Sequence, residues 1–207
     1  GSNLNLLETQ TGDAYEAGAE WSQARLLLRG TLFRNDLENE IAFDPLSFTN
    51  INLDHTRRDG LMLESRWQLA DRFTLAAAGQ YVDAQIRNGG FSGNPVPLVA
   101  KYSGKLSADL GLPRGLNAYA EVIAIDSRGF AGDYDRTLDD LPGHAVVNLA
   151  LGGRWGKFSL RGRVNNLLDR EYSEYGAAGT DPANFSEAAS FQPSPTRNFW
   201  LTLGYAL

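Results

Sequence analysis

The chain has 207 residues, a formal net charge of −6 and no cysteine, and this length fits one domain of ordinary size. The acidic balance, with no basic run longer than Arg57-Arg58, argues against a nucleic-acid-binding surface. No stretch approaches the roughly 18 consecutive apolar residues of a transmembrane helix, whereas a membrane-spanning strand needs apolar residues only at alternate positions.

Along the whole chain, apolar and polar residues alternate with the period of two that is typical of β-strands, and helical periodicity is nearly absent. In the second run, for example, Leu26 and Leu28 alternate with Arg25 and Arg29. The predicted strands are 13–21, 24–43, 50–69, 72–87, 97–111, 116–128, 142–155, 157–171 and 197–207. Alternation is weaker in the sixth and seventh of these because Ala and Gly occupy much of the apolar face.

The connections between the predicted strands are alternately short and long. Tight turns are expected at 22–23, 70–71, 113–115 and 156, and longer polar or Gly- and Pro-rich loops at 44–50, 88–96, 128–141 and 173–196. Transmembrane β-barrels have this asymmetry, with short periplasmic turns and long extracellular loops. The pattern therefore predicts an all-β fold, an antiparallel transmembrane β-barrel, and favours it over a soluble meander or sandwich.

The last predicted strand carries a continuous apolar face. Asn198, Thr202, Gly204 and Ala206 fall on the other face, with Trp200 among them. An apolar face of this kind is typical of a strand whose outer side meets lipid. The residues on that face are Phe199, Leu201, Leu203, Tyr205 and Leu207.

The predicted strand number points to a part of a larger barrel. Nine strands leave two edges open in lipid, which is costly, and single-chain bacterial barrels normally have an even number. Residues 3–12 are too short and polar for a convincing tenth strand. We therefore expect the carboxyl-terminal portion of a barrel, about nine to ten strands in a single segment at 3–207, with Gly1-Ser2 as a cloning remnant.

Several motifs resemble those of TonB-dependent outer-membrane receptors. Asn166-Leu167-Leu168-Asp169-Arg170-Glu171-Tyr172 resembles the N-L-F-D-x-x-Y motif that opens the last hairpin in that family. Leu168 departs from the usual Phe of the motif, Leu207 from the usual terminal Phe, and no Pro precedes Glu8. Further similar segments follow in the family's order: Glu8 with Tyr15-Glu16-Ala17-Gly18, then 33–41, 57–64 and Pro195-Thr196-Arg197.

The resemblance implies a barrel of 22 strands in the whole receptor, an amino-terminal plug and a box that grips TonB. This chain would supply roughly the last nine strands and neither plug nor box, so TonB would act only through the missing amino-terminal part. The implied function is active uptake across the bacterial outer membrane, most often of a ferric siderophore or a similar scarce chelate. Haem, cobalamin and oligosaccharide stay open as ligands. The implied partners are outer-membrane lipid and the barrel-assembly machinery, which would read the apolar face of the last strand.

Candidate functional residues follow from this implied role. Inward-facing cations such as Arg25, Arg29, Arg66, Lys101, Lys105, Arg161 and Arg163 would line the lumen, where they pair with plug carboxylates or meet water. For Asn166, Leu167, Asp169 and Tyr172 we expect a structural role, with the Asn and Asp side chains bonding the backbone at the loop exit. Ligand contacts, or alternatively girdle and loop packing, are expected of Arg128, Phe130, Tyr134, Arg136, Tyr175, Phe185 and Phe191.

No catalytic, metal or cofactor site is predicted, and the chain is not expected to be an enzyme. Asp133, Asp135, Asp139 and Asp140 lack the Gly and distal Glu of an EF-hand loop, so a solvated acidic loop is favoured over a calcium site. The two histidines lie on different predicted strands. Two alternatives stay open: a stand-alone barrel of eight to ten strands acting as a pore or adhesin, and a soluble lipocalin-like protein with an apolar interior.

Overall fold

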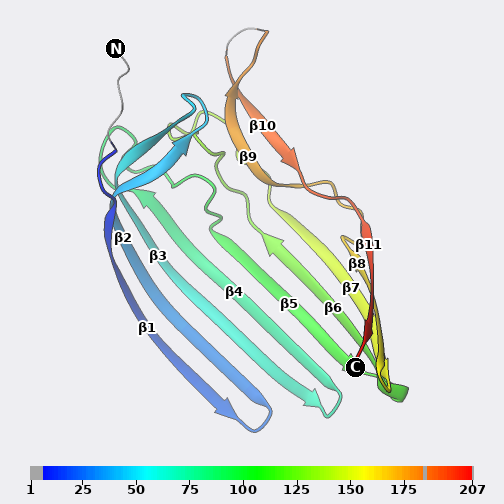
Figure 1. The fold of residues 1–207 in the computed structure, drawn as a ribbon. Coiled ribbons are helices and arrows are strands. Elements are labelled where there is room, and N and C mark those ends of the chain that lie inside the picture. The colour runs from blue at the N-terminus through cyan, green and yellow to red at the C-terminus, as the bar shows by residue number, and fades with distance from the viewer. Residues whose placement is uncertain (1–6, 184–185, 207) are drawn as a thin grey trace.

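The computed structural model describes residues 7–183 and 186–206, and Gly1-Ser2 lies outside this part. Nine antiparallel strands form one curved sheet in the order β1-β2-β3-β4-β5-β6-β7-β8-β11 (Figure 1). The strands are β1 (Thr11–Gln23), β2 (Leu26–Asp44), β3 (Thr49–Ala70), β4 (Phe73–Ile86), β5 (Tyr102–Gly111), β6 (Leu116–Ile125), β7 (His144–Trp155), β8 (Phe158–Asn165) and β11 (Asn198–Tyr205). No helix in the described residues is long and apolar enough to cross a membrane.

The predicted antiparallel all-β fold is confirmed, with differences at several strand ends and in one loop; the strand predicted from 97, for example, begins at Tyr102. The predicted strand 157–171 ends at Asn165, because Asn166 (φ 50°) and Asp169 (φ 54°) adopt the left-handed conformation and cannot continue it. The predicted loop 173–196 contains a separate hairpin of β9 (Ser173–Thr180) and β10 (Glu187–Pro193). In addition, η1 (Pro113–Gly115) forms the turn between β5 and β6.

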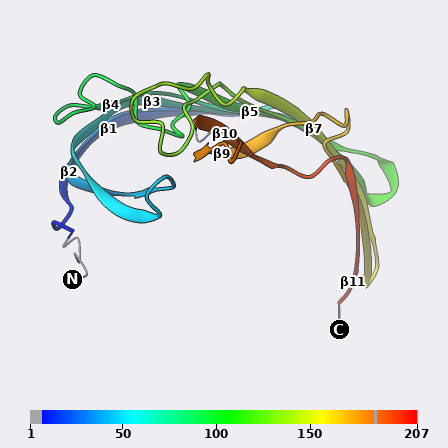
Figure 2. The same ribbon diagram turned by 90° about the horizontal axis from the view of Figure 1, so that it is seen from above.

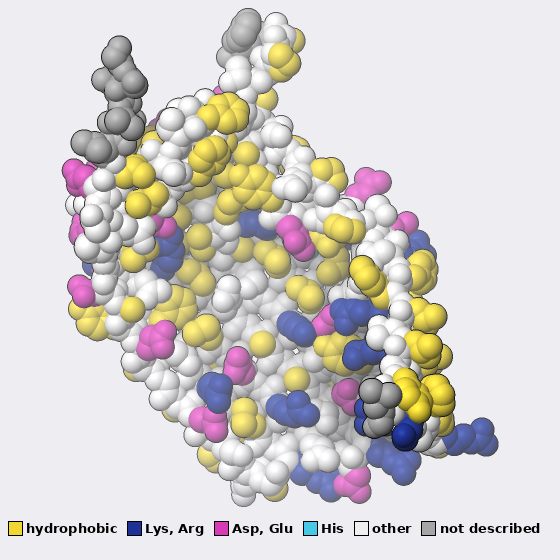
Figure 3. All heavy atoms as spheres, viewed as in Figure 1, with side chains coloured by type: hydrophobic (Ala, Val, Ile, Leu, Met, Phe, Trp, Pro, Cys, Tyr) yellow, Lys and Arg dark blue, Asp and Glu magenta, His cyan; other side chains and the backbone are white. Residues whose placement is uncertain are grey.

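The sheet separates an apolar face from a polar one. Directly opposed residues of antiparallel strands share a face, and Leu61 opposes Leu32 on one side and Tyr81 on the other. Viewed from above, the strands form an open arc (Figure 2). Figure 3 shows the sheet from its concave side, and Lys, Arg, Asp and Glu side chains gather over its lower part. The apolar side chains therefore lie on the convex face, the reverse of the apolar interior that the lipocalin alternative requires.

Aromatic side chains bound the convex apolar band at both ends. Along β4 the band runs from Phe73 to Tyr81, roughly 26 Å at about 3.3 Å per residue. A strand tilted by about 40°, as in a barrel, projects this length onto roughly 20 Å along the barrel axis, somewhat less than the apolar band of about 25 Å that outer-membrane barrels present. Near the loop end lie Tyr15, Tyr81 and Tyr102, and near the turn end lie Trp21, Trp67, Phe73, Trp155, Phe158 and Tyr205.

The strand register is staggered as in a barrel wall. Leu26, at the turn end of β2, opposes Trp67. The same row of opposed residues then crosses the sheet to Val164 and Phe199 at the loop end of β8 and β11. A row perpendicular to the strands climbs from one end of the sheet to the other only if the strands are tilted, which barrel closure requires.

Candidate functional site

The concave face is centred on one carboxylate, that of Glu121 on β6, whose side chain is 4% exposed. Its Oε2 lies 2.8 Å from Lys105 Nζ and accepts the Tyr119 hydroxyl at 2.7 Å. Its Oε1 accepts Asn148 Nδ2 at 3.0 Å and Arg163 Nη2 at 2.5 Å. These donors come from four adjacent strands, so the carboxylate links β5 to β8 across the concave face.

The network continues toward β11. The Arg163 Nε donates to Asn165 Oδ1 at 2.5 Å, and the Asn165 amide donates to Asn198 Oδ1 at 2.9 Å. The same oxygen accepts Trp200 Nε1 at 2.8 Å. A chain of polar contacts therefore runs from β5 to the last strand of the sheet, on the face that the predicted barrel would turn to its lumen.

Of the other cations predicted to line the lumen, Arg29, Arg66 and Arg161 lie on the concave face and Lys101 does not. Arg29 bridges Glu20 at 2.5 Å and Glu64 at 3.4 Å on the concave face of β1–β3. Arg66 and Arg161 share that face by register, opposing Leu27 and Thr202. Lys101 does not fit the prediction. Residue 101 precedes β5, and its Nζ lies 5.7 Å from the ring centroid of Tyr81, a residue of the convex face.

The loops above β2–β7 form one connected layer. The Tyr134 ring packs against Phe91 at a centroid distance of 5.3 Å, and its carbonyl accepts Asn94 Nδ2 at 2.7 Å. Burial, helped by the nearby carboxylates of Asp44 and Glu40, raises the pKa of Tyr134 to about 12. Beneath this contact lies a small apolar core that includes Leu53, Val82, Ala84, Ile86 and Val96.

The β9–β10 hairpin docks on the loop between β6 and β7. Phe130, 1% exposed, packs edge-on against Phe191 at a centroid distance of 5.2 Å. The Ala131 N–H donates to the Gly176 carbonyl at 2.9 Å, and the Ala178 N–H donates to the Ala131 carbonyl at 2.7 Å. The Arg128 guanidinium donates to the Glu174 carbonyl at 2.5 Å, and burial lowers the pKa of Arg128.

The segment after β8 is held by side-chain-to-backbone bonds. The Asn166 amide donates to the Arg170 carbonyl at 2.8 Å, and its Oδ1 accepts the Arg170 N–H at 2.9 Å. Asp169 Oδ1 accepts the Arg197 N–H at 2.8 Å, which ties this segment to the start of β11. The Leu167 N–H donates to the Val147 carbonyl at 2.7 Å. The Tyr172 ring lies 4.4 Å from that of His144.

The predicted ligand-contact residues have different exposures. Tyr175 and Phe191 are 39% and 51% exposed, whereas Arg128, Phe130 and Tyr134 are all at most 7% exposed. Arg136 is half-buried and pairs with Asp140 at 2.5 Å. Phe185 and Leu207 lie outside the described residues.

The acidic loop residues have no metal-binding arrangement. Asp133, 1% exposed, accepts the Thr137 and Leu138 N–H groups at 2.8 Å and 3.4 Å, so its carboxylate caps a turn. Within residues 7–183 and 186–206, no group of three or more His, Cys, Asp or Glu side chains is placed to hold a metal ion.

Sequence reasoning missed the Glu121 network and the hairpin. The signal for Glu121 was present, because Asn117, Tyr119 and Glu121 alternate with Ala118 and Ala120. The hairpin gave no such signal, since β9 consists largely of Gly, Ala and Ser and β10 ends in Pro193.

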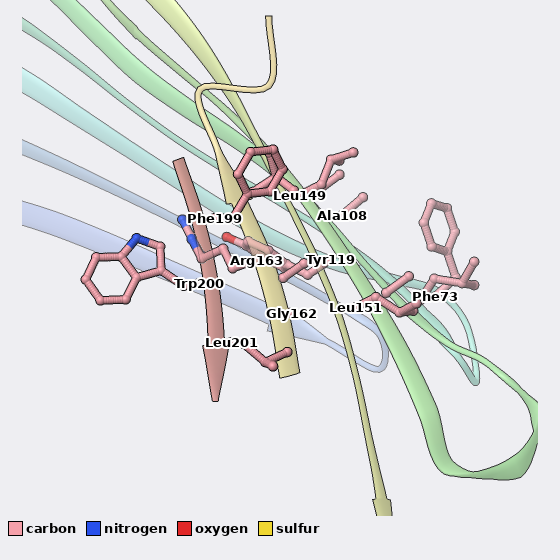
Figure 4. A pocket seen from close by; sticks show the side chains of 15 residues that line it. Phe73, Ala108, Tyr119, Leu149, Leu151, Gly162, Arg163, Phe199, Trp200 and Leu201 are labelled. Carbon is pink, nitrogen blue, oxygen red and sulfur yellow. The ribbon is translucent and has the colours of Figure 1, made fainter. Parts of the chain in front are cut away.

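An apolar groove also crosses the convex face over β5–β8 and β11 (Figure 4). Ala108, Ala118, Ala120 and Gly162 leave space between the larger side chains of Leu149, Leu151, Phe199 and Leu201. Phe199 and Trp200, neighbours on β11, point to opposite sides of the sheet (Figure 4). This groove belongs to the apolar band, and its lining also includes Tyr119, Arg163 and Trp200, which are residues of the concave network.

Comparison with known proteins agrees with this geometry. The sequence signature described as "TonB dependent receptor-like, beta-barrel" matches residues 1–167. The chain belongs to the TonB-dependent receptor family. Members of this family are outer-membrane proteins that interact with TonB, and they include receptors for ferric chelates.

Individual relatives are distant and longer. The probable TonB-dependent siderophore receptor PiuA of Acinetobacter baumannii is 22% identical over 188 residues, which cover 83% of this chain and 25% of that protein. The ferric yersiniabactin uptake receptor FyuA from Yersinia pestis has a TM-score of 0.78 at 21% identity, covering 95% of this chain and 30% of that one. The copper transporter OprC has a TM-score of 0.78 at 18% identity, covering 98% and 32%. The chain thus spans about a quarter to a third of these relatives and forms part of a receptor barrel.

Proposed function

We propose that this chain is a wall segment of an outer-membrane active transporter that takes up a ferric siderophore or a similar metal chelate. The observation that carries the proposal is the division of the sheet: an apolar convex band between two aromatic girdles, and a concave face of paired charges. Relatives named as siderophore and ferric-chelate receptors support the ligand class. In this role the convex face meets lipid and the concave face lines the path of the ligand.

The exposed loop aromatics are the proposed ligand contacts. Tyr175 and Phe191 offer accessible rings on the docked hairpin, and Arg136 offers a half-buried cation on the neighbouring loop. Arg128, Phe130 and Tyr134 would act through them, by holding the hairpin and the loops in place. Phe185 keeps its proposed contact role from the sequence alone.

The remaining proposed roles concern assembly and the site of action. Asn166, Leu167, Asp169 and Tyr172 would fix the connection between β8 and β11, which their bonds to backbone groups support. Phe199, Leu201, Leu203, Tyr205 and Leu207 would form the surface that the barrel-assembly machinery reads. The protein would act in the outer membrane, with TonB engaging a part of the receptor other than this wall.

Uptake of radioactive iron tests the proposal. Iron-starved cells that express the protein as its gene encodes it are given 55Fe bound to catecholate, hydroxamate or citrate chelators, one at a time. We expect accumulation with at least one chelator, and its loss in a strain that lacks TonB. Accumulation that persists without TonB, or solute leakage through the protein without energy, would instead indicate a passive pore.

A further inference from the structure

The loop that follows β4 contains Asn88-Gly89, the single Asn-Gly pair of the sequence. Asn is a thermolabile residue, because the backbone nitrogen of the next residue can attack its side-chain carbonyl carbon. The attack is easiest before Gly, which has no Cβ to crowd a five-membered ring and adopts a wide range of backbone conformations. Whether the pair reacts in the folded protein depends on its exposure and on the hydrogen bonds of its amide groups.

The fold leaves both reacting groups free. Asn88 and Gly89 are exposed. Within residues 7–183 and 186–206, neither the Asn88 side chain nor the Gly89 N–H makes a hydrogen bond. Gly89 has a φ of 82°, in the left-handed region that favours glycine, so the loop depends on the same residue that makes the pair reactive.

The backbone on both sides of the pair is fixed. The Arg87 N–H donates to the His55 carbonyl at 2.7 Å, which continues the antiparallel pairing of β3 with β4. The Gly93 N–H donates to the Ile86 carbonyl at 2.8 Å and closes the loop. The pair therefore lies at an exposed tip between two anchored ends, where a local rotation of the backbone costs little.

We propose that Asn88 is a site of spontaneous deamidation in the folded protein. The Gly89 nitrogen loses its proton and bonds to Asn88 Cγ, and the Cγ–Nδ2 bond breaks to release ammonia. Water then opens the resulting succinimide at either of its two carbonyl carbons, which leaves aspartate or isoaspartate at this position. The overall reaction consumes a water molecule, releases ammonia and needs no oxidant or cofactor.

The product brings a new negative charge next to Asp54. Because Arg87 pairs with His55 across the two strands, the next residue, Asn88, follows opposite Asp54. A Cβ on Gly89 would collide with Asp54 Oδ2, so this carboxylate already lies against the loop. Like charges directly opposite each other on neighbouring strands are destabilising. Deamidation should therefore push the loop away from β3.

The same loop carries contacts to the loop between β6 and β7. The Phe91 ring packs on Tyr134, and Asn94 Nδ2 donates to the Tyr134 carbonyl at 2.7 Å. Repulsion at Asp54 should loosen these contacts, so the reaction would act as an age-dependent change in the loop layer. The inference does not rest on the proposed transport function, because it uses only the chemistry and contacts of this loop.

Peptide mapping by mass spectrometry tests the proposal on the protein as its gene encodes it, folded in detergent and incubated in mildly alkaline water enriched in 18O. Chymotryptic peptides that span 82–91 report on Asn88, because the new carboxyl group carries the isotope. We expect Asn88 to convert at least about tenfold faster than Asn94 in the same loop, because the following Pro95 has no N–H with which to attack. Conversion of Asn88 only after unfolding in urea, or at the rate of Asn94, would overturn the proposal.

Three variants test the chemistry and its effect on the loop. Gly89→Ala should slow the conversion about tenfold in the folded and in the urea-unfolded protein, because a Cβ crowds the ring in both. Asn88→Asp, which carries the product's charge, should speed hydrogen exchange of the amides of 88–94. Adding Asp54→Asn to Asn88→Asp should restore their protection. Equal conversion with and without Gly89, or unchanged exchange in Asn88→Asp, would contradict the reaction and its effect on the loop, respectively. Neither readout involves iron uptake, so failure of this proposal and failure of transport are distinguishable.

Discussion

Glu121 is one side chain that determines how four strands sit against each other on the concave face. Its carboxylate accepts from Lys105, Tyr119, Asn148 and Arg163, which occupy β5 to β8. A buried carboxylate with four donors is satisfied as an anion, and sliding one of these strands by a residue would remove its donor from the carboxylate and leave buried polar groups without partners. The residue therefore favours one register for this half of the sheet.

Replacing Glu121 with Gln should destabilise the sheet by about 1–3 kcal/mol, because the amide removes the charge that Lys105 and Arg163 share and turns an N–H₂ group toward their donors. Urea unfolding of the detergent-solubilised protein, followed by tryptophan fluorescence, measures this loss. Glu64→Gln is the matched control: its carboxylate is 54% exposed and 3.4 Å from Arg29, so a change within about 0.5 kcal/mol is expected. Equal effects of the two variants would contradict the role given to Glu121.

Asp169 should make the connection between β8 and β11 sensitive to acid. The backbone N–H of Arg197, together with its guanidinium 3.1 Å away, lowers the pKa of the Asp169 carboxyl. A group with a depressed folded-state pKa contributes stability that is present above its unfolded pKa, about 3.9, and is lost as pH falls through the folded pKa. Asn tolerates the left-handed backbone of this position and remains uncharged.

The experiment therefore compares the wild-type protein with the Asp169→Asn variant. The midpoint of urea unfolding is measured for both proteins from pH 7 down to pH 3. The wild type should be the more stable of the two at pH 7, and the difference should shrink below about pH 4. A difference that stays constant over the whole pH range would show that the carboxylate charge is not what holds Arg197.

At the scale of elements, the β9–β10 hairpin depends on one buried ring. Phe130 fills the space between Phe191 and Gly176, where a Cβ on Gly176 would lie 2.5 Å from the ring. Phe130→Ala should remove about 3–5 kcal/mol of packing free energy. Because the hairpin belongs to a separate sheet, the loss should appear as local opening rather than global unfolding.

Hydrogen exchange measured by mass spectrometry resolves this prediction. In the Phe130→Ala variant, amides of 173–180 and 187–193 should exchange faster, while those of β3–β7 keep their protection. Phe48→Ala, which truncates a loop ring that is 81% exposed, should change neither region. Faster exchange throughout the main sheet would mean that the hairpin and the sheet unfold as one unit.

The strands of the main sheet were predictable because apolar and polar residues alternate along a strand whose two faces meet different surroundings, such as lipid and lumen. Their loop ends were not, since they depend on left-handed residues such as Leu98 and Asn166 that have no periodic signal. The hairpin was missed for a related reason. Its anchor, Phe130, lies in a different loop, and a contact between two loops leaves no local pattern.

For the whole molecule, sequence motifs indicated the family, and the structure adds how the two faces are arranged. Arg29, Arg66 and Arg163 lie on the concave face, as their predicted lumenal position requires, because strand parity decides the face. The prediction was wrong for Lys101, where the strand begins one residue later. The exposure of the loop candidates was not predictable. Phe130 and Phe191 are both phenylalanines in predicted loops, and the docking of the hairpin leaves Phe130 buried and Phe191 exposed.

The most direct test of the central claim, that the convex face meets lipid and the concave face lines the lumen, uses three consecutive alanines of β4. Ala77 opposes Leu106 on the convex face, whereas Ala76 and Ala78 oppose Ser107 and Lys105 on the concave face. The chain has no cysteine, so Ala→Cys at each position gives one site in this chain for a nitroxide spin label.

The measurement is the accessibility of each label, in bilayers, to dissolved oxygen and to a water-soluble nickel chelate. We predict high oxygen and low nickel accessibility at position 77, and a lower ratio of oxygen to nickel accessibility at positions 76 and 78. Equal values at all three positions, or the reverse alternation, would contradict the assignment of the convex face to lipid.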